Sequence, residues 1–117
     1  MTKKYLEKLS SVIKKAVPNQ FKNIKLECRH FFSGAALYAN GKICATLTPQ
    51  GFAVKIPEKN IEKLLKEKKA KKLRYFPKAP IKKGYVVLSA ELINDLKILR
   101  YYTKMGIKNI IKEEIKN

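Results

Sequence analysis

The spacing of apolar residues predicts one helix at the N-terminal end of the chain, one in its middle and two at its C-terminal end. In each of these segments, apolar side chains recur at the i, i+3, i+4 spacing of one helical face. Pro18 should end the first helix, because the residue before a proline avoids helical backbone angles. Ser89 is suited to cap the third helix, and Gly106 is suited to end it. We expect helices over residues 2–17, 57–70, 90–105 and 108–116.

Alternating apolar and polar residues predict an antiparallel sheet between these helices. Asn40-Gly41 is the clearest turn, because a type I′ hairpin needs positive φ at both central positions and this pair tolerates it. Residues 48–51, Thr-Pro-Gln-Gly, form a second turn. The expected strands are residues 24–32, 35–39, 42–48, 51–56, 72–76 and 84–88.

The alternation also assigns side chains to the faces of this sheet. Three groups should each share a face: Leu26, Cys28, His30 and Phe32; Ile43, Ala45 and Leu47; Phe52, Val54 and Ile56. The order helix, four strands, helix, two strands, two helices describes an α+β domain. Its antiparallel sheet of five or six strands would carry helices on one face. A chain of 117 residues should form one domain over 1–117, with its core within 3–104 and a short helix within 107–117.

The unusual feature of the composition is its charge. The chain has 27 basic and 9 acidic residues, a formal net charge of +18, and only three of the basic residues are arginine. Lysine attracts polyanions diffusely, whereas arginine recognises phosphates and base edges with paired hydrogen bonds. We therefore expect contact with DNA or RNA without sequence specificity, or with an acidic protein. The alternative is that the lysines serve only solubility or thermostability.

Basic residues are densest over residues 63–83, which contain a single acid, Glu67. We call these cations the basic tract: Lys63, Lys66, Lys68, Lys69, Lys71, Lys72, Arg74, Lys78, Lys82 and Lys83. Tyr75, Phe76 and Tyr85 are interleaved with the tract and are candidates for stacking on bases. Cations along a phosphate backbone with rings between them are typical of proteins that bind single-stranded nucleic acid. The alternative is a solvated helix end and loop, with one ring in the core.

Residues suited to catalysis or metal binding are few. His30 is the only histidine, and Cys28 and Cys44 are the only cysteines, so the four ligands of a structural zinc site are lacking. A nucleophile pair of Cys28 and His30 would need a third group to orient the imidazole, and no carboxylate is evidently placed for this. We expect both cysteines to be buried free thiols, with a disulfide as the alternative. No catalytic residue, metal or cofactor is expected.

No apolar run approaches the roughly 20 residues that cross a bilayer, and charges interrupt the apolar residues of the N-terminus. A cytoplasmic protein with no membrane partner is expected. The alternative to polyanion binding is a protein–protein contact or a homodimer. Strand edges and the isoleucine-rich segment from Ile107 to Ile115 would form that contact.

Five short segments follow one another in a characteristic order. They are Phe31-Phe32-Ser33-Gly34-Ala35-Ala36-Leu37-Tyr38, Asn40-Gly41-Lys42-Ile43-Cys44-Ala45, Gly51-Phe52-Ala53-Val54-Lys55, Leu73-Arg74-Tyr75-Phe76 and Lys83-Gly84-Tyr85-Val86-Val87-Leu88. Their order and spacing resemble the TfoX N-terminal domain family, the front half of the Sxy/TfoX competence regulators. The resemblance covers about residues 3–104, nearly the whole chain.

The chain also departs from the family pattern. Ser33 and Ala36 stand where the family has glycine, Ala53 where it has an aromatic residue, and Ser89 where it has proline. The resemblance implies one part of a transcriptional co-regulator, without base-specific reading of DNA and without catalytic residues. The second domain of the full regulators is not expected here, so a role in competence does not carry over. Our hypothesis is a small, basic, non-enzymatic regulatory or interaction module.

Overall fold

The computed structural model describes residues 2–17 and 23–116 and contains one sheet with helices packed on it. The elements are α1 (Thr2–Ala16), β1 (Leu26–Phe31), β2 (Gly34–Ala39), β3 (Lys42–Thr48), β4 (Gly51–Lys55), α2 (Glu58–Lys66), β5 (Ala70–Lys72), β6 (Tyr85–Leu88), α3 (Ala90–Ile93) and α4 (Leu96–Lys116). The six strands are all antiparallel, in the order β1-β2-β3-β4-β6-β5. The expected α+β class and the order of the elements are confirmed. Pro18, expected to end α1, lies outside the described residues.

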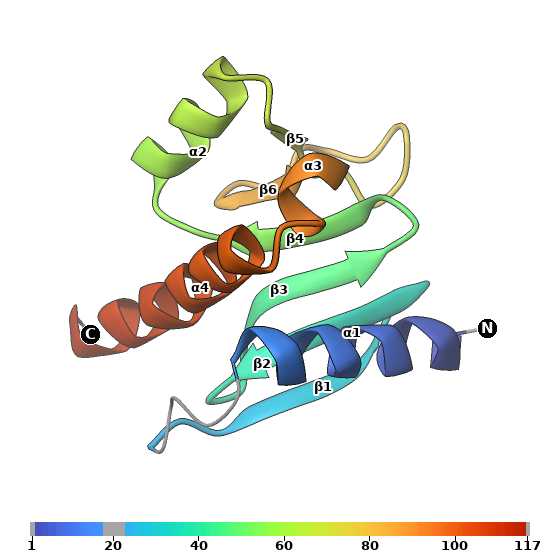
Figure 1. Cartoon of the computed structure of the whole chain (residues 1–117), viewed down its shortest axis with the longest axis vertical. Coiled ribbons are helices and arrows are strands. Elements are labelled where there is room, and N and C mark those ends of the chain that lie inside the picture. Colours follow the sequence, from blue (N-terminus) through green and yellow to red (C-terminus); the bar gives the residue numbers. More distant parts are fainter. Residues whose placement is uncertain (1, 18–22, 117) are drawn as a thin grey trace.

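The main core lies between the sheet and the two long helices. Figure 1 shows α1 and α4 side by side over one face of the sheet, with α3 joining β6 to α4. Leu9 of α1 and Ile107 of α4 are fully buried here against strand residues such as Leu37 and Val54. The predicted helix-covered face is therefore the face that buries most of the apolar surface.

A second, smaller core covers part of the opposite face. Side chains alternate between faces along a strand, so Ala53 on β4 and Val87 on β6 point away from the helices. The segment of residues 73–84, which links β5 to β6, packs Leu73 and Tyr75 against them. Both faces of this part of the sheet are consequently buried, one by helices and one by a loop.

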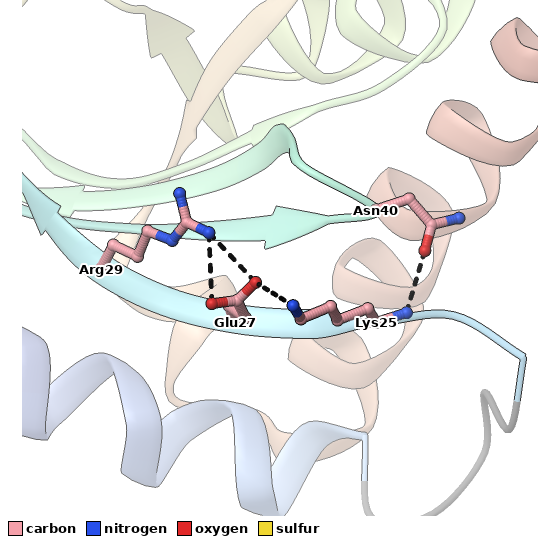
Figure 2. A network of polar contacts seen from close by, with 4 residues as sticks. All are labelled: Lys25, Glu27, Arg29 and Asn40. Atoms are coloured by element: carbon pink, nitrogen blue, oxygen red, sulfur yellow. Dashed lines mark hydrogen bonds and ion pairs between the residues drawn. The ribbon is translucent and has the colours of Figure 1, made fainter.

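The Asn40-Gly41 hairpin forms as the sequence predicts. The φ angles are 50° at Asn40 and 82° at Gly41, both in the left-handed region that a type I′ turn requires. The side chain of Asn40 also connects the turn to the start of β1 and to α4. Its side-chain oxygen accepts a hydrogen bond of 2.9 Å from the backbone N–H of Lys25 (Figure 2), and its Nδ2 donates to Glu114 of α4 at 3.2 Å.

A β-bulge at Cys44 alters the faces predicted for β3. Tyr38 pairs with Ile43, but Leu37 pairs with Ala45, so Cys44 is the extra residue of β3. Ile43 therefore joins the second core, whereas Ala45 packs in the main core. The expectation that Ile43 shares a face with Ala45 and Leu47 is wrong, because the bulge reverses the alternation.

The first strand is shorter than predicted at its C-terminal end. Phe32 has a φ of 51° and lies in the turn between β1 and β2, with 73% of its surface exposed. His30 is exposed as well, although it lies on an edge strand, and Cys28 is half-buried. The regular pairing of β1 with β2 keeps His30 on the face of Leu26 and Cys28, as predicted. The extension of this face to Phe32 is wrong, because the positive φ of Phe32 takes it out of the strand.

The boundary between α2 and β5 also differs from the prediction. The helix ends at Lys66 rather than at residue 70, because Lys68 turns the chain with a φ of 59°. Helices commonly end at such a left-handed residue, but it is usually glycine, and lysine gives no signal of it. The following strand consequently covers residues 70–72 and not 72–76.

Helix α4 runs through Gly106, which was predicted to end a helix. The helix predicted from Ser89 stops at Ile93, and α4 begins after Asp95, whose side chain accepts a hydrogen bond of 3.0 Å from the N–H of Lys97. Gly106 is buried inside α4, where an added Cβ would lie 3.1 Å from the carbonyl oxygen of Cys44. Gly106 thus lets the helix approach β3 closely, and no separate last helix exists over residues 108–116.

Candidate nucleic-acid interface

The basic tract lies on α2, on β5 and on the loop 73–84. All ten of its side chains are exposed. Among the described residues only Lys69 of the tract forms an ion pair, at 3.9 Å from Glu67. The stretch 68–90 contains eight basic residues and no acidic one. The charge of this stretch is therefore almost uncompensated locally.

The structure does not gather the tract on one face. Lys68 and Lys71 line a hollow of about 470 Å³ beside Ser89, near the start of α3. Lys72 and Lys83 line another hollow of about 280 Å³, between α2 and the loop. Neighbouring residues of a strand point to opposite sides, so Lys71 and Lys72 separate on β5. The tract is consequently spread over more than one side of the domain near β5.

The loop 73–84 is held by its own hydrogen bonds. Arg74 donates from Nη1 to the carbonyl oxygen of Ala79 at 2.6 Å. The N–H of Ala79 donates to the carbonyl oxygen of Phe76 at 2.9 Å, and that of Lys82 donates to Leu73 at 2.9 Å. Ala79 is buried beneath this turn. These hydrogen bonds give the backbone of the loop a defined conformation, and its lysines are exposed on it.

The three rings proposed for stacking have different environments. Tyr85 is only 7% exposed, and its hydroxyl donates to the carbonyl oxygen of Ile43 at 3.4 Å. Burial also raises the pKa of Tyr85 well above its ordinary value. Its ring is therefore part of the second core, and we withdraw it as a stacking residue. Tyr75 is half-buried, and Phe76 is exposed.

An aromatic cluster forms where the loop meets the turn between β1 and β2. The ring of Tyr75 lies 5.4 Å from that of Phe31 and 5.3 Å from that of Phe32, measured between centroids. A hollow of about 460 Å³ is lined by Phe32, Ser33, Tyr75 and Phe76. Sequence reasoning missed the two phenylalanines because it placed Phe32 in the first strand rather than in the turn that follows it. Their position beside Ser-Gly, a turn signal, could have identified them.

Strand β1 adds charged groups on the face that carries Phe31. Figure 2 shows Arg29 and Lys25 on either side of Glu27, at 3.1 and 3.3 Å from its carboxylate. The hydrogen bond from Arg29, and next that from Lys25, hold the pKa of Glu27 below its usual range. The guanidinium of Arg29 also lies 4.9 Å above the ring of Tyr38. Two cations share one acid here, so a positive charge remains.

The two cysteines are free thiols. Burial raises the pKa of Cys28, and it raises that of Cys44 to about 12. Both are consequently protonated near neutral pH, which opposes nucleophilic activation of either sulfur. Within residues 2–17 and 23–116, no group of three or more His, Cys, Asp or Glu side chains is arranged to hold a metal ion. In the same part of the chain, no helix combines the length and apolar character needed to cross a membrane.

Comparison with known families identifies the fold. The model of the TfoX N-terminal domain matches residues 20–110, from just before β1 into the second half of α4. A comparison with curated proteins found no match. The matched region contains the whole sheet, the loop 73–84 and the aromatic cluster. Because the match covers most of the 117 residues, the chain belongs to the TfoX N-terminal domain family.

Proposed function

We propose that this domain is a regulatory or interaction module that contacts nucleic acid without sequence specificity, through the exposed cations of residues 68–83. The observation that carries the proposal is the charge of residues 68–90, where eight basic residues occur without an acid. An exposed cation without a protein partner gains most when it meets a phosphate, because counterions are then released from the nucleic acid.

The type of cation explains why sequence specificity is not expected. Seven of the eight basic residues in 68–90 are lysines, which act on phosphates as point charges. The exception, Arg74, already donates to Ala79 within its own loop. Reading a base edge requires a side chain whose hydrogen-bonding groups are free and fixed in direction. Affinity should therefore depend on phosphate contacts and vary little with base sequence.

The test compares two triple variants with the same reduction in charge. Lys78, Lys82 and Lys83 are changed to glutamine in one, and Lys104, Lys108 and Lys112 of α4 in the other. Binding of a fluorescent DNA of generic sequence is measured by anisotropy between about 50 and 200 mM salt, where phosphate-driven affinity falls steeply. The loop variant should weaken binding and lower the salt slope by about 0.7–0.9 for each phosphate that the protein no longer neutralises. Equal effects of the two variants would refute the location, and no binding at low salt would refute nucleic-acid contact.

Self-association is the second candidate, and the fold narrows the surface that it could use. The isoleucine-rich segment was predicted to be a contact surface. Two of its residues, Ile107 and Ile110, are instead fully buried in the domain's own core. Ile115 remains 78% exposed. Removal of residues 107–117 would damage the core, so the better variant is Ile115→Lys. Light scattering should show a dimer that this change dissociates; a monomer at all concentrations argues against self-association.

A further inference from the structure

The hollow between the β1–β2 turn and the loop 73–84 exposes aromatic rings to solvent. Phe32 is 73% exposed and Phe76 is 59% exposed, and the half-buried Tyr75 lines the hollow with them. Large apolar rings usually remove far more of their surface from water. A group of them around an open hollow is therefore a feature that the packing of this domain does not explain.

The backbone conformation of Phe32 is a second feature that the packing of the domain does not explain. Phe32 has a positive φ of 51°, whereas Ser33, the other central residue of the turn, does not. Positive φ at the first central position alone is the pattern of a type II′ turn, where glycine is preferred. A bulky residue in the left-handed region is strained. The fold therefore holds an exposed ring at a position where local preference favours a residue without one.

Basic residues adjoin these rings along the chain, on β1 and in the loop. Arg29 precedes Phe31 by two residues on β1 and so lies on the same face of that strand. Arg74 and Lys78 flank Tyr75 and Phe76 in the loop. The nearest acid on β1, Glu27, is already shared by two cations. A ligand for this hollow should thus combine negative charge with flat, apolar surfaces.

We infer that the hollow is a stacking site for unpaired bases, so the domain prefers single-stranded over double-stranded nucleic acid. This inference rests on the proposed function and names its substrate class. Bases of a single strand can expose their faces to Phe32 and Phe76, while the phosphates beside them meet the surrounding cations. In a duplex the faces of the bases are stacked on each other, so the rings gain nothing. The positive charge of the segments that carry these rings, with Arg29, Arg74 and Lys78, favours this occupant over an apolar peptide or a second copy of the chain.

The experiment measures binding of a thymine 20-mer and of a duplex of equal length, by anisotropy at one salt concentration. Phe32→Asn and Phe76→Ala each remove one exposed ring. Asparagine tolerates positive φ, so the first variant should fold. Tyr101→Ala is the matched control, because Tyr101 is 58% exposed on α4, whose buried face packs in the main core. Each hollow variant should weaken single-strand binding at least about fivefold, while duplex binding, the salt slope and the control stay unchanged.

The outcomes separate this inference from the proposed function. If the glutamine loop variant weakens binding while both ring variants bind the single strand like the natural chain, the stacking site is refuted and the proposed function stands. Equal weakening for the single strand and the duplex would also refute the stacking site. If no nucleic acid binds at all, both fail together. A ring variant that dissociates a dimer in light scattering would make a second copy the occupant and overturn the inference.

Discussion

Gly34, the first residue of β2, should be one of the least replaceable residues of the fold. A Cβ added at Gly34 would overlap the backbone carbonyl oxygen of Leu47 and lie 2.8 Å from Cα of Thr48. Carbon atoms pack favourably at about 3.5–4.0 Å, so β2 and β3 would have to separate by roughly 0.7–1.2 Å. Both obstacles are backbone atoms inside the sheet, which cannot rotate away as a side chain can. Gly34→Ala should therefore lower the free energy of unfolding by about 3 kcal/mol, at the upper end of overpacking costs.

Gly41→Ala is the matched control for this change. Gly41 has a φ of 82°, and an added Cβ there would meet no atom within 4 Å. Gly41→Ala should therefore lower the free energy of unfolding by about 1 kcal/mol, through the strained backbone conformation alone. In a domain of this size, 3 kcal/mol corresponds to a decrease of roughly 10–15 °C in Tm.

Urea and thermal unfolding, followed by circular dichroism, would measure both variants. The Gly34 variant should be the less stable by about 2 kcal/mol. If Gly34→Ala is as stable as Gly41→Ala, the close approach of β2 to β3 is not what requires glycine, and the reasoning is refuted.

Three further predictions concern α4 and the thiols. Gly106→Leu should lower the free energy of unfolding by about 3 kcal/mol in urea titrations, because the side chain would force α4 off β3. Gly106→Ala should cost less, since alanine's helix propensity offsets about 1 kcal/mol; the reverse order would contradict the packing argument. Asp95→Ala should cost about 1 kcal/mol through loss of the α4 cap, and no change in Tm would show that the cap is dispensable. Because burial raises the pKa of Cys44 to about 12, the unfolded thiol ionises first, and stability should fall as the pH rises from about 8.5 toward 12. The pH profile of Cys44→Ala should be shallower than that of the natural chain by up to about 1.4 kcal/mol per pH unit, while Cys28 and Tyr85, whose pKa values burial also raises, still contribute. Parallel pH profiles of the two proteins would refute this prediction.

Local signals predicted much of the architecture. The 3.6-residue period of α1 and the Asn40-Gly41 turn depend on residues close together in the chain, and both form where expected. The apolar residues of β4 alternate as predicted, because no bulge interrupts that strand's own register. The candidate site was predicted less well. The exposed lysines were found, but Tyr85 was placed at the surface although it is buried in the second core.

The sequence alone determined the order of helices and strands and the fold class, because periodicity and turn chemistry are local properties. It also determined the family, through the order and spacing of short motifs. Only the tertiary structure shows why a glycine stands at position 106 inside α4. A backbone carbonyl oxygen of β3, distant in the chain, lies too close for a side chain there. The tertiary structure also decided that Cys44 forms a bulge and that the loop 73–84 covers the face of the sheet opposite the helices. That loop brings Tyr75 to Phe32, and the rings of Phe32 and Phe76 stay exposed. Which rings stay in solvent depends on the partners that long-range packing supplies, and no local pattern encodes those partners.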